Sequence, residues 1–73
     1  MPEVRVQNKL FVVTSHCLKR IYERGQDLES VREAMEKGRW VPIPTGYQII
    51  SGELTVIVAK NRVLITVYTN SDR

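Results

Sequence analysis

The C-terminal half of the chain contains three β-rich runs, at residues 47–50, 54–59 and 63–69. Two short turn sequences, Ser51-Gly52 and Asn61-Arg62, separate these runs and are typical of tight hairpins. Two hairpins in series predict a three-stranded antiparallel meander. Because both faces of the sheet are apolar at its centre, we expect one face to pack on helices. The other is then covered by neighbours of an N-terminal strand, covered by a partner, or left as a binding surface.

The chain before the meander begins with a predicted strand and a helix. Residues 4–14 contain a cluster of β-branched side chains that predicts a short strand, and Ser15 follows as a helix N-cap. A two-turn amphipathic helix is expected from residue 16 to residue 24, with Gly25 as its terminator. The apolar residues that carry its periodicity are Leu18, Ile21 and Tyr22.

A second helix is expected to begin at Asp27, as the N-cap, and to end at Gly38. Residues 39–46 then form a connecting loop, since Pro42 and Pro44 are unsuited to a central strand. The predicted fold class is therefore α+β, with the order β-α-α-β-β-β and two helices packed on a small antiparallel sheet.

The length of 73 residues allows one compact core, because a chain of this size buries only about 60% of the surface that it exposes when unfolded. We expect a single domain over residues 1–73, with its core at about residues 9–69 and a frayed tail at residues 70–73. A homodimer is an expected supplement to stability at this size.

Charge and cysteine content bear on partners and location. The net charge of +3 attracts phosphate-bearing partners or serves only to keep the surface solvated, and both interpretations remain open. Cys17 is the only cysteine, which excludes an intramolecular disulfide, so a cytoplasmic protein is the default expectation. Residues 1–9 lack the apolar region of a signal peptide, and no apolar stretch approaches the about 20 residues that cross a bilayer. No membrane association is expected.

Three side chains that can carry positive charge recur on the first predicted helix. His16, Arg20 and Arg24 are spaced by four residues and therefore share one stripe. A histidine can donate or accept a proton near neutral pH, and guanidinium groups can clamp a phosphate. These properties suit phosphodiester chemistry. The alternative is that both arginines lie in solvent and that His16 caps the first turn.

The last predicted strand offers hydroxyl groups on one face. Thr66 and Tyr68 alternate along the strand and share this face with Leu64, and Arg62 precedes the strand in the hairpin. Tyr68 can position a scissile phosphate or shuttle a proton, Thr66 can orient an attacking group, and Arg62 can reach the same region. Alternatively, Tyr68 buries its ring in the core with its hydroxyl at the rim, and Arg62 is only solvated.

Other residues allow a further binding mode and argue against metal chemistry. Trp40 and Tyr47 could stack on bases of single-stranded nucleic acid, or Trp40 could simply cover one end of the core. Cys17 follows His16, but the chain has no second cysteine or histidine to complete a metal site. No metal ion or other cofactor is expected.

The order of these motifs resembles that of a known group of proteins. A strand is followed by the helical segments SHCLKRIYERG and VREAMEKG and by a last strand with the segment LITVYTN. Over residues 10–69 this pattern resembles a family of small uncharacterised bacterial and archaeal domains, which is similar to RelE-like toxins of the barnase, colicin and RelE ribonuclease group. Two features differ from that group: the predicted sheet offers mainly Lys60 and Arg62 as basic residues, and Glu53 lies in a turn.

The resemblance implies a small metal-independent endoribonuclease. His16, Arg20 and Tyr68 would be catalytic, whereas Arg24, Arg62 and Thr66 would bind substrate. The implied partners are RNA or the ribosome and a cognate antitoxin. Two alternatives remain: a non-catalytic module that binds RNA or protein through the same surfaces, and a structural or regulatory protein whose charges only keep it soluble.

Overall fold

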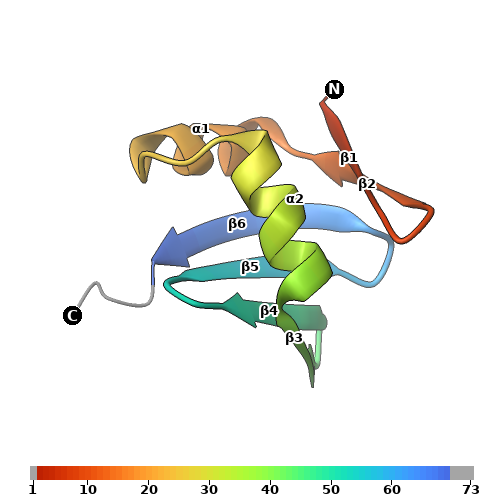
Figure 1. The fold of residues 1–73 in the computed structure, drawn as a ribbon. Coiled ribbons are helices and arrows are strands. Elements are labelled where there is room, and N and C mark those ends of the chain that lie inside the picture. Colours follow the sequence, from red (N-terminus) through yellow and green to blue (C-terminus); the bar gives the residue numbers. More distant parts are fainter. Residues whose placement is uncertain (1, 70–73) are drawn as a thin grey trace.

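The computed structural model describes residues 2–69 and shows an α+β fold with two helices and one six-stranded mixed sheet (Figure 1). In chain order the elements are β1 (Glu3–Val6), β2 (Lys9–Val13), α1 (Ser15–Glu23), α2 (Leu28–Lys37), β3 (Arg39–Ile43), β4 (Gly46–Ser51), β5 (Leu54–Ala59) and β6 (Val63–Thr69). The predicted frayed tail at residues 70–73 lies outside the described residues. The α+β class with two helices is confirmed, but the element order differs from the predicted β-α-α-β-β-β.

The sheet has the strand order β1-β2-β6-β5-β4-β3. The predicted meander is present as β4, β5 and β6, which pair antiparallel through two consecutive hairpins. β2 joins the meander through a short parallel pairing with β6, in which Val12 lies opposite Val63 and Val13 lies opposite Leu64. This parallel pair makes the sheet mixed, whereas the sequence predicted a purely antiparallel one.

The first correction concerns residues 4–14, where one strand was predicted and a hairpin is found. β1 and β2 pair antiparallel, and Val6 lies opposite Lys9, so Gln7 and Asn8 form a two-residue turn. Both turn residues have positive φ, 53° and 67°, as a type I′ turn requires. Asparagine tolerates this conformation, which makes Asn8 the sequence signal for the turn. The hairpin adds Val4 to the core.

The second correction concerns residues 39–46, where a connecting loop was predicted. Arg39–Ile43 form β3, which pairs with β4 at the edge of the sheet. Pro42 lies opposite Tyr47. A proline is tolerated there because an edge strand has only one neighbour and does not need every backbone N–H for pairing.

Capping interactions explain the limits of α1. The N-cap is Thr14 rather than the predicted Ser15, and its side chain accepts a hydrogen bond from the Cys17 N–H at 3.1 Å. The Thr14 hydroxyl also donates to the carbonyl oxygen of Leu64 at 3.1 Å, which ties the start of α1 to β6. After the helix, Gly25 has a φ of 72°, a left-handed conformation that glycine adopts without strain.

The limits predicted for α2 are confirmed. Asp27 is the N-cap, and its carboxylate accepts a hydrogen bond from the Ser30 N–H at 2.8 Å. This bond holds the pKa of Asp27 below its usual range. Gly38 is the C-cap and donates its N–H to the carbonyl oxygen of Ala34 at 2.7 Å. Lys37 places a positive charge in the last turn, where the helix dipole favours it.

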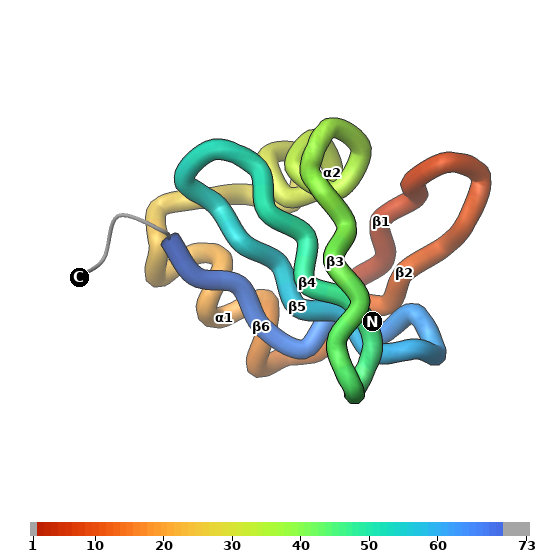
Figure 2. The backbone as a smooth tube through the Cα atoms, turned by 90° about the horizontal axis from the view of Figure 1, so that it is seen from below, coloured from red at the N-terminus to blue at the C-terminus, as the bar shows by residue number. Residues whose placement is uncertain are grey.

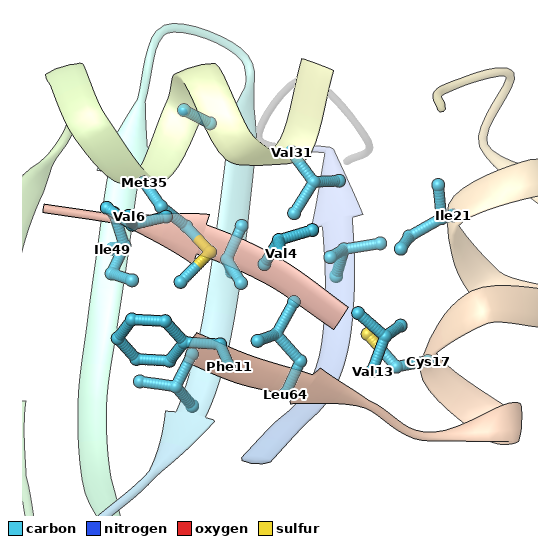
Figure 3. Packing of buried hydrophobic residues seen from close by; sticks show 14 of the residues in the cluster. Val4, Val6, Phe11, Val13, Cys17, Ile21, Val31, Met35, Ile49 and Leu64 are labelled. Atoms are coloured by element: carbon cyan, nitrogen blue, oxygen red, sulfur yellow. The ribbon is translucent and has the colours of Figure 1, made fainter. Parts of the chain in front are cut away.

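The core lies between the helices and one face of the sheet, as predicted. Figure 1 shows α2 crossing this face, and the close view shows Val31 and Met35 of α2 directed toward the strands (Figure 3). On α1, Cys17 and Ile21 are fully buried. Tyr22 is 59% exposed, so the buried side of this helix differs from the predicted one.

The opposite face of the meander remains partly exposed. Tyr68 lies opposite Thr55, which in turn lies opposite Ile50. Thr55 is only 1% exposed between these two neighbours, whereas Tyr68 is 37% and Ile50 is 38% exposed. The β1–β2 hairpin extends the sheet beyond β6 and stands apart from β3 and β4 at its tip (Figure 2).

Candidate functional site

The predicted basic stripe lies along α1, and part of it is exposed to solvent. His16 and Arg20 are exposed, and the adjoining side of the helix buries Cys17. A guanidinium nitrogen of Arg20 lies 3.6 Å from a carboxylate oxygen of Glu23, one turn along the helix. This ion pair is exposed and therefore weak, so Arg20 can exchange its partner for a phosphate.

Arg24 differs from the other two members of the stripe because it is half-buried at the end of α1. It is the C-cap residue, and its backbone N–H donates to the carbonyl oxygen of Arg20 at 3.0 Å. Arg24 is less exposed than Arg20, and its Nε atom is buried. Arg24 therefore anchors the end of the stripe, while His16 and Arg20 are its accessible part.

The predicted hydroxyl groups of β6 lie on the face of the sheet that points away from α2. Thr66 lies opposite Ile57 and Tyr68 lies opposite Thr55, so the two residues share a face. The Tyr68 hydroxyl accepts a hydrogen bond from the Gln48 side-chain amide at 3.2 Å. With 37% of its surface exposed, Tyr68 is a surface residue rather than a core residue.

Leu64 is not on this face, which corrects the prediction that it accompanies Thr66 and Tyr68. The register between β5 and β6 shifts near Ile57 and Val58, so that Thr66 lies opposite Ile57 but Leu64 lies opposite Val58. The bulge turns Leu64 into the core, where it is 0% exposed.

Arg62 lies at the other end of the strand from Tyr68. Six residues separate them along the chain, which corresponds to about 20 Å in an extended strand. The two side chains therefore do not meet at one phosphate. Arg62 lines a pocket of about 440 Å³ together with residues of the β1–β2 hairpin and of β3, β4 and β5. Figure 2 shows the tip of this hairpin standing apart from β3 and β4.

This pocket combines basic and aromatic side chains from segments that are distant in the sequence. Its lining residues are Val6, Gln7, Lys9, Phe11, Trp40, Tyr47, Val58, Ala59, Lys60 and Arg62. Three of them are cationic and none is acidic. The sequence points to Arg62 and to the pair of Trp40 and Tyr47 as separate candidates, and no local pattern joins them or indicates Lys9.

Trp40 occupies the centre of a row of three rings in the pocket wall. Its ring centroid lies 6.0 Å from that of Phe11 and 5.5 Å from that of Tyr47, in tilted and edge-on arrangements. The indole N–H donates to the carbonyl oxygen of Met35 at 2.8 Å, which fixes the ring. Phe11 is buried and Tyr47 is 40% exposed, so the row runs from the core to the surface.

The described residues 2–69 were also searched for a reactive thiol, a metal site and a membrane-spanning helix. Burial raises the pKa of the Cys17 thiol to about 11. The described part of the chain brings together no group of three or more His, Cys, Asp and Glu side chains suited to a metal ion. Nor is any of its helices long and apolar enough to cross a membrane.

Comparison of the chain with protein-family models, with curated proteins and with solved structures gave no match.

Proposed function

We propose that the protein acts on RNA as a small metal-independent endoribonuclease of the RelE-like type. One arrangement supports this function: α1, which exposes His16 and Arg20, packs along β6, which exposes Tyr68 (Figure 1). The hydrogen bond from Thr14 to the Leu64 carbonyl oxygen fixes the start of the helix against the strand. A proton-transfer group, a cation and a hydroxyl are thereby carried by two elements in direct contact.

The reaction that suits these groups is internal transesterification of RNA. The ribose 2′-oxygen attacks the adjacent phosphorus and loses its proton to a base, while the 5′-oxygen of the next nucleotide leaves and gains a proton. The products are a 2′,3′-cyclic phosphate and a free 5′-hydroxyl. Because the nucleophile belongs to the substrate, the protein needs to supply only proton transfer, positioning and charge stabilisation.

Each candidate group has one role in this reaction. His16 acts as the general acid or base, since a histidine exchanges protons near neutral pH. Arg20, with Arg24 beside it, stabilises the additional negative charge on the pentacoordinate phosphate. Tyr68, whose hydroxyl is oriented by Gln48, positions the scissile group.

The test is cleavage of a labelled single-stranded RNA, free or bound to ribosomes, in the presence of a chelator. We expect His16→Gln to reduce cleavage about 10²–10⁴-fold, as loss of a general acid or base does. Arg20→Gln should reduce it by about 10²-fold or more. The matched control is Lys19→Gln, which removes an exposed charge of the same helix that lies outside the stripe. It should change the rate less than about threefold, since an exposed charge that does not touch the phosphate acts only weakly.

The outcomes separate catalysis from contamination. Chelator-resistant cleavage that is lost with His16→Gln and retained with Lys19→Gln supports the ribonuclease. Equal cleavage by the wild-type protein and all three variants would show that another enzyme in the preparation causes it. No cleavage of free or ribosome-bound RNA by the wild-type protein would contradict the ribonuclease.

A second candidate function is RNA binding without cleavage, and the pocket lined by Lys60 and Arg62 favours it. Three cations and no carboxylate line this pocket, so it suits an anionic ligand whether or not the chain cleaves it. Binding of single-stranded RNA by a preparation that shows no cleavage would identify this function.

A further inference from the structure

We propose that the pocket between the β1–β2 hairpin and the meander binds one nucleotide, with an aromatic base against Tyr47 and a phosphate on Lys60 and Arg62. The inference rests on the proposed action on RNA, because it assigns the site that holds the strand, but it does not require cleavage. A free nucleotide and a single-stranded RNA share this chemistry, and the experiment below distinguishes them.

The pocket is positively charged. Lys9, Lys60 and Arg62 line it, and within residues 2–69 none of them forms an ion pair with a carboxylate. By contrast, the charge of Arg32 is neutralised by nearby carboxylates. On α2, Arg32 forms ion pairs with Glu29 and Glu36, each one turn away.

The pocket is therefore a place where positive charge is concentrated without local neutralisation. Such a concave, basic surface attracts a phosphate and raises its local concentration. Lysine and arginine contacts to the backbone phosphates supply most of the sequence-independent affinity for nucleic acids.

The aromatic row in the pocket wall is fixed in place. Trp40 is held from three sides, by Phe11, by Tyr47 and by its hydrogen bond to the Met35 carbonyl oxygen. Since the indole N–H is already used, only the ring surface is left to interact with a ligand. Tyr47 extends this fixed surface toward solvent. Preorganised rings of this kind stack on unpaired bases of any sequence.

The size and the walls of the pocket fit a single nucleotide. Its volume of about 440 Å³ lies at the lower end of the range for small-molecule sites, which suits a single nucleotide. Gln7, at the tip of the hairpin, adds a side-chain amide that can both donate and accept hydrogen bonds to the lining. A base must leave a double helix to reach such a ring row, so a single strand is the expected form of RNA.

Trp40 makes the site directly measurable, because it is the only tryptophan in the chain. We would titrate the protein with an eight-nucleotide 2′-O-methyl RNA, which lacks the nucleophile needed for cleavage, and follow tryptophan fluorescence. The other probes are adenosine monophosphate, adenosine and ribose 5-phosphate. We expect the oligonucleotide to quench the fluorescence, and adenosine and ribose 5-phosphate to bind more weakly than adenosine monophosphate.

The variants separate the base contact from the phosphate contact. Tyr47→Ala should weaken oligonucleotide binding about tenfold or more through lost stacking. Lys60→Gln and Arg62→Asn should each weaken it several-fold. Each should also reduce the slope of log affinity against log salt concentration by about 1, because one phosphate contact is lost. Asparagine is chosen at position 62 because Arg62 has a φ of 66°, a left-handed conformation that asparagine tolerates.

The controls are Tyr22→Ala and Lys37→Gln, which remove an exposed tyrosine and an exposed lysine outside the pocket. Both should leave the affinity within about twofold of wild type, because neither side chain touches the ligand. Lys60→Gln changes only an exposed turn residue, so it remains informative even if Tyr47→Ala impairs folding.

Each outcome bears on the pocket separately from the ribonuclease. Quenching that Lys60→Gln weakens and His16→Gln leaves intact supports the pocket, even if no RNA is cleaved. Binding of adenosine monophosphate as tightly as the oligonucleotide identifies a free nucleotide as the ligand, whereas much tighter oligonucleotide binding identifies a strand. Binding or cleavage of RNA with no change in Trp40 fluorescence and no effect of Lys60→Gln would overturn the pocket while leaving the action on RNA in place.

Discussion

At the scale of single residues, neighbours on α1 have opposite surroundings. His16 is exposed and Cys17 is 0% exposed, because successive residues of a helix project about 100° apart. Burial away from water disfavours the thiolate and raises the pKa of Cys17 from 9.0 to about 11. The thiol is therefore protonated at neutral pH and is a poor nucleophile, despite the histidine before it.

This burial predicts a loss of stability at alkaline pH. Below pH 9 the thiol keeps its proton in both the folded and the unfolded state, so its contribution is complete there. Between pH 9 and about 11 the unfolded state ionises first, and the free energy of unfolding should fall by on the order of 2 kcal/mol. Urea unfolding between pH 7 and 10.5 measures the effect. Cys17→Ala should lack this part of the decline, and the same pH dependence in both proteins would contradict the prediction.

Residue positions were predictable from the sequence where local periodicity determines them. The alternation of a strand places Thr66 and Tyr68 on one face without knowledge of the rest of the fold. Leu64 was not predictable in this way, because the bulge between β5 and β6 interrupts the alternation. Tyr22 fits the apolar periodicity of α1, yet its large exposed surface shows that tertiary packing selects the buried side.

At the scale of elements, the two strands that the sequence did not predict lie at the ends of the sheet. The sequence predicts one strand in place of β1 and β2 because both strands contain valines. In the structure, the turn at Gln7 and Asn8, which both have positive φ, separates the two strands. β3 was assigned to a loop because prolines are rare in central strands, but they are compatible with an edge. The sequence of an edge strand is less restricted than that of a central strand, because about half of its backbone N–H and C=O groups have no neighbouring strand to pair with.

The junction between α2 and β3 depends on Gly38. An added Cβ atom would lie 2.5 Å from the Ala34 carbonyl oxygen and 2.9 Å from the Ile50 carbonyl oxygen, which belong to different elements. We expect Gly38→Ala to reduce the free energy of unfolding by about 1–3 kcal/mol, because backbone atoms on two sides cannot both move away. Thermal unfolding followed by circular dichroism measures this.

The control for Gly38→Ala is Gly25→Asn. Gly25 has nothing within 4 Å of an added Cβ atom, and its φ of 72° is tolerated by asparagine. This variant should therefore lose at most about 1 kcal/mol. A melting temperature for Gly38→Ala equal to or above that of Gly25→Asn would mean that the junction can relax.

At the scale of the whole molecule, the pocket arises from contacts that no local pattern predicts. Its lining comes from residues 6–11, 40–47 and 58–62, which meet only because β2 pairs with β6 and because β3 folds back on β4. From the sequence, Trp40 and Tyr47 were candidates for base stacking, and Arg62 was a separate candidate beside Tyr68. The sequence could not predict that Lys9 joins them, since that depends on a parallel pairing between strands fifty residues apart.

The same long-range assembly makes the β1–β2 hairpin part of the core. Val6 is 1% exposed, whereas the adjacent Arg5 points to solvent. We expect Val6→Ala to reduce the free energy of unfolding by about 2 kcal/mol through lost burial and the cavity that remains, and Arg5→Ala to change it by less than about 0.5 kcal/mol. Urea unfolding of both variants tests this, and Trp40 fluorescence provides the signal. If both variants unfold at the wild-type midpoint, the hairpin is only loosely attached. The pocket that it closes would then lack a fixed wall.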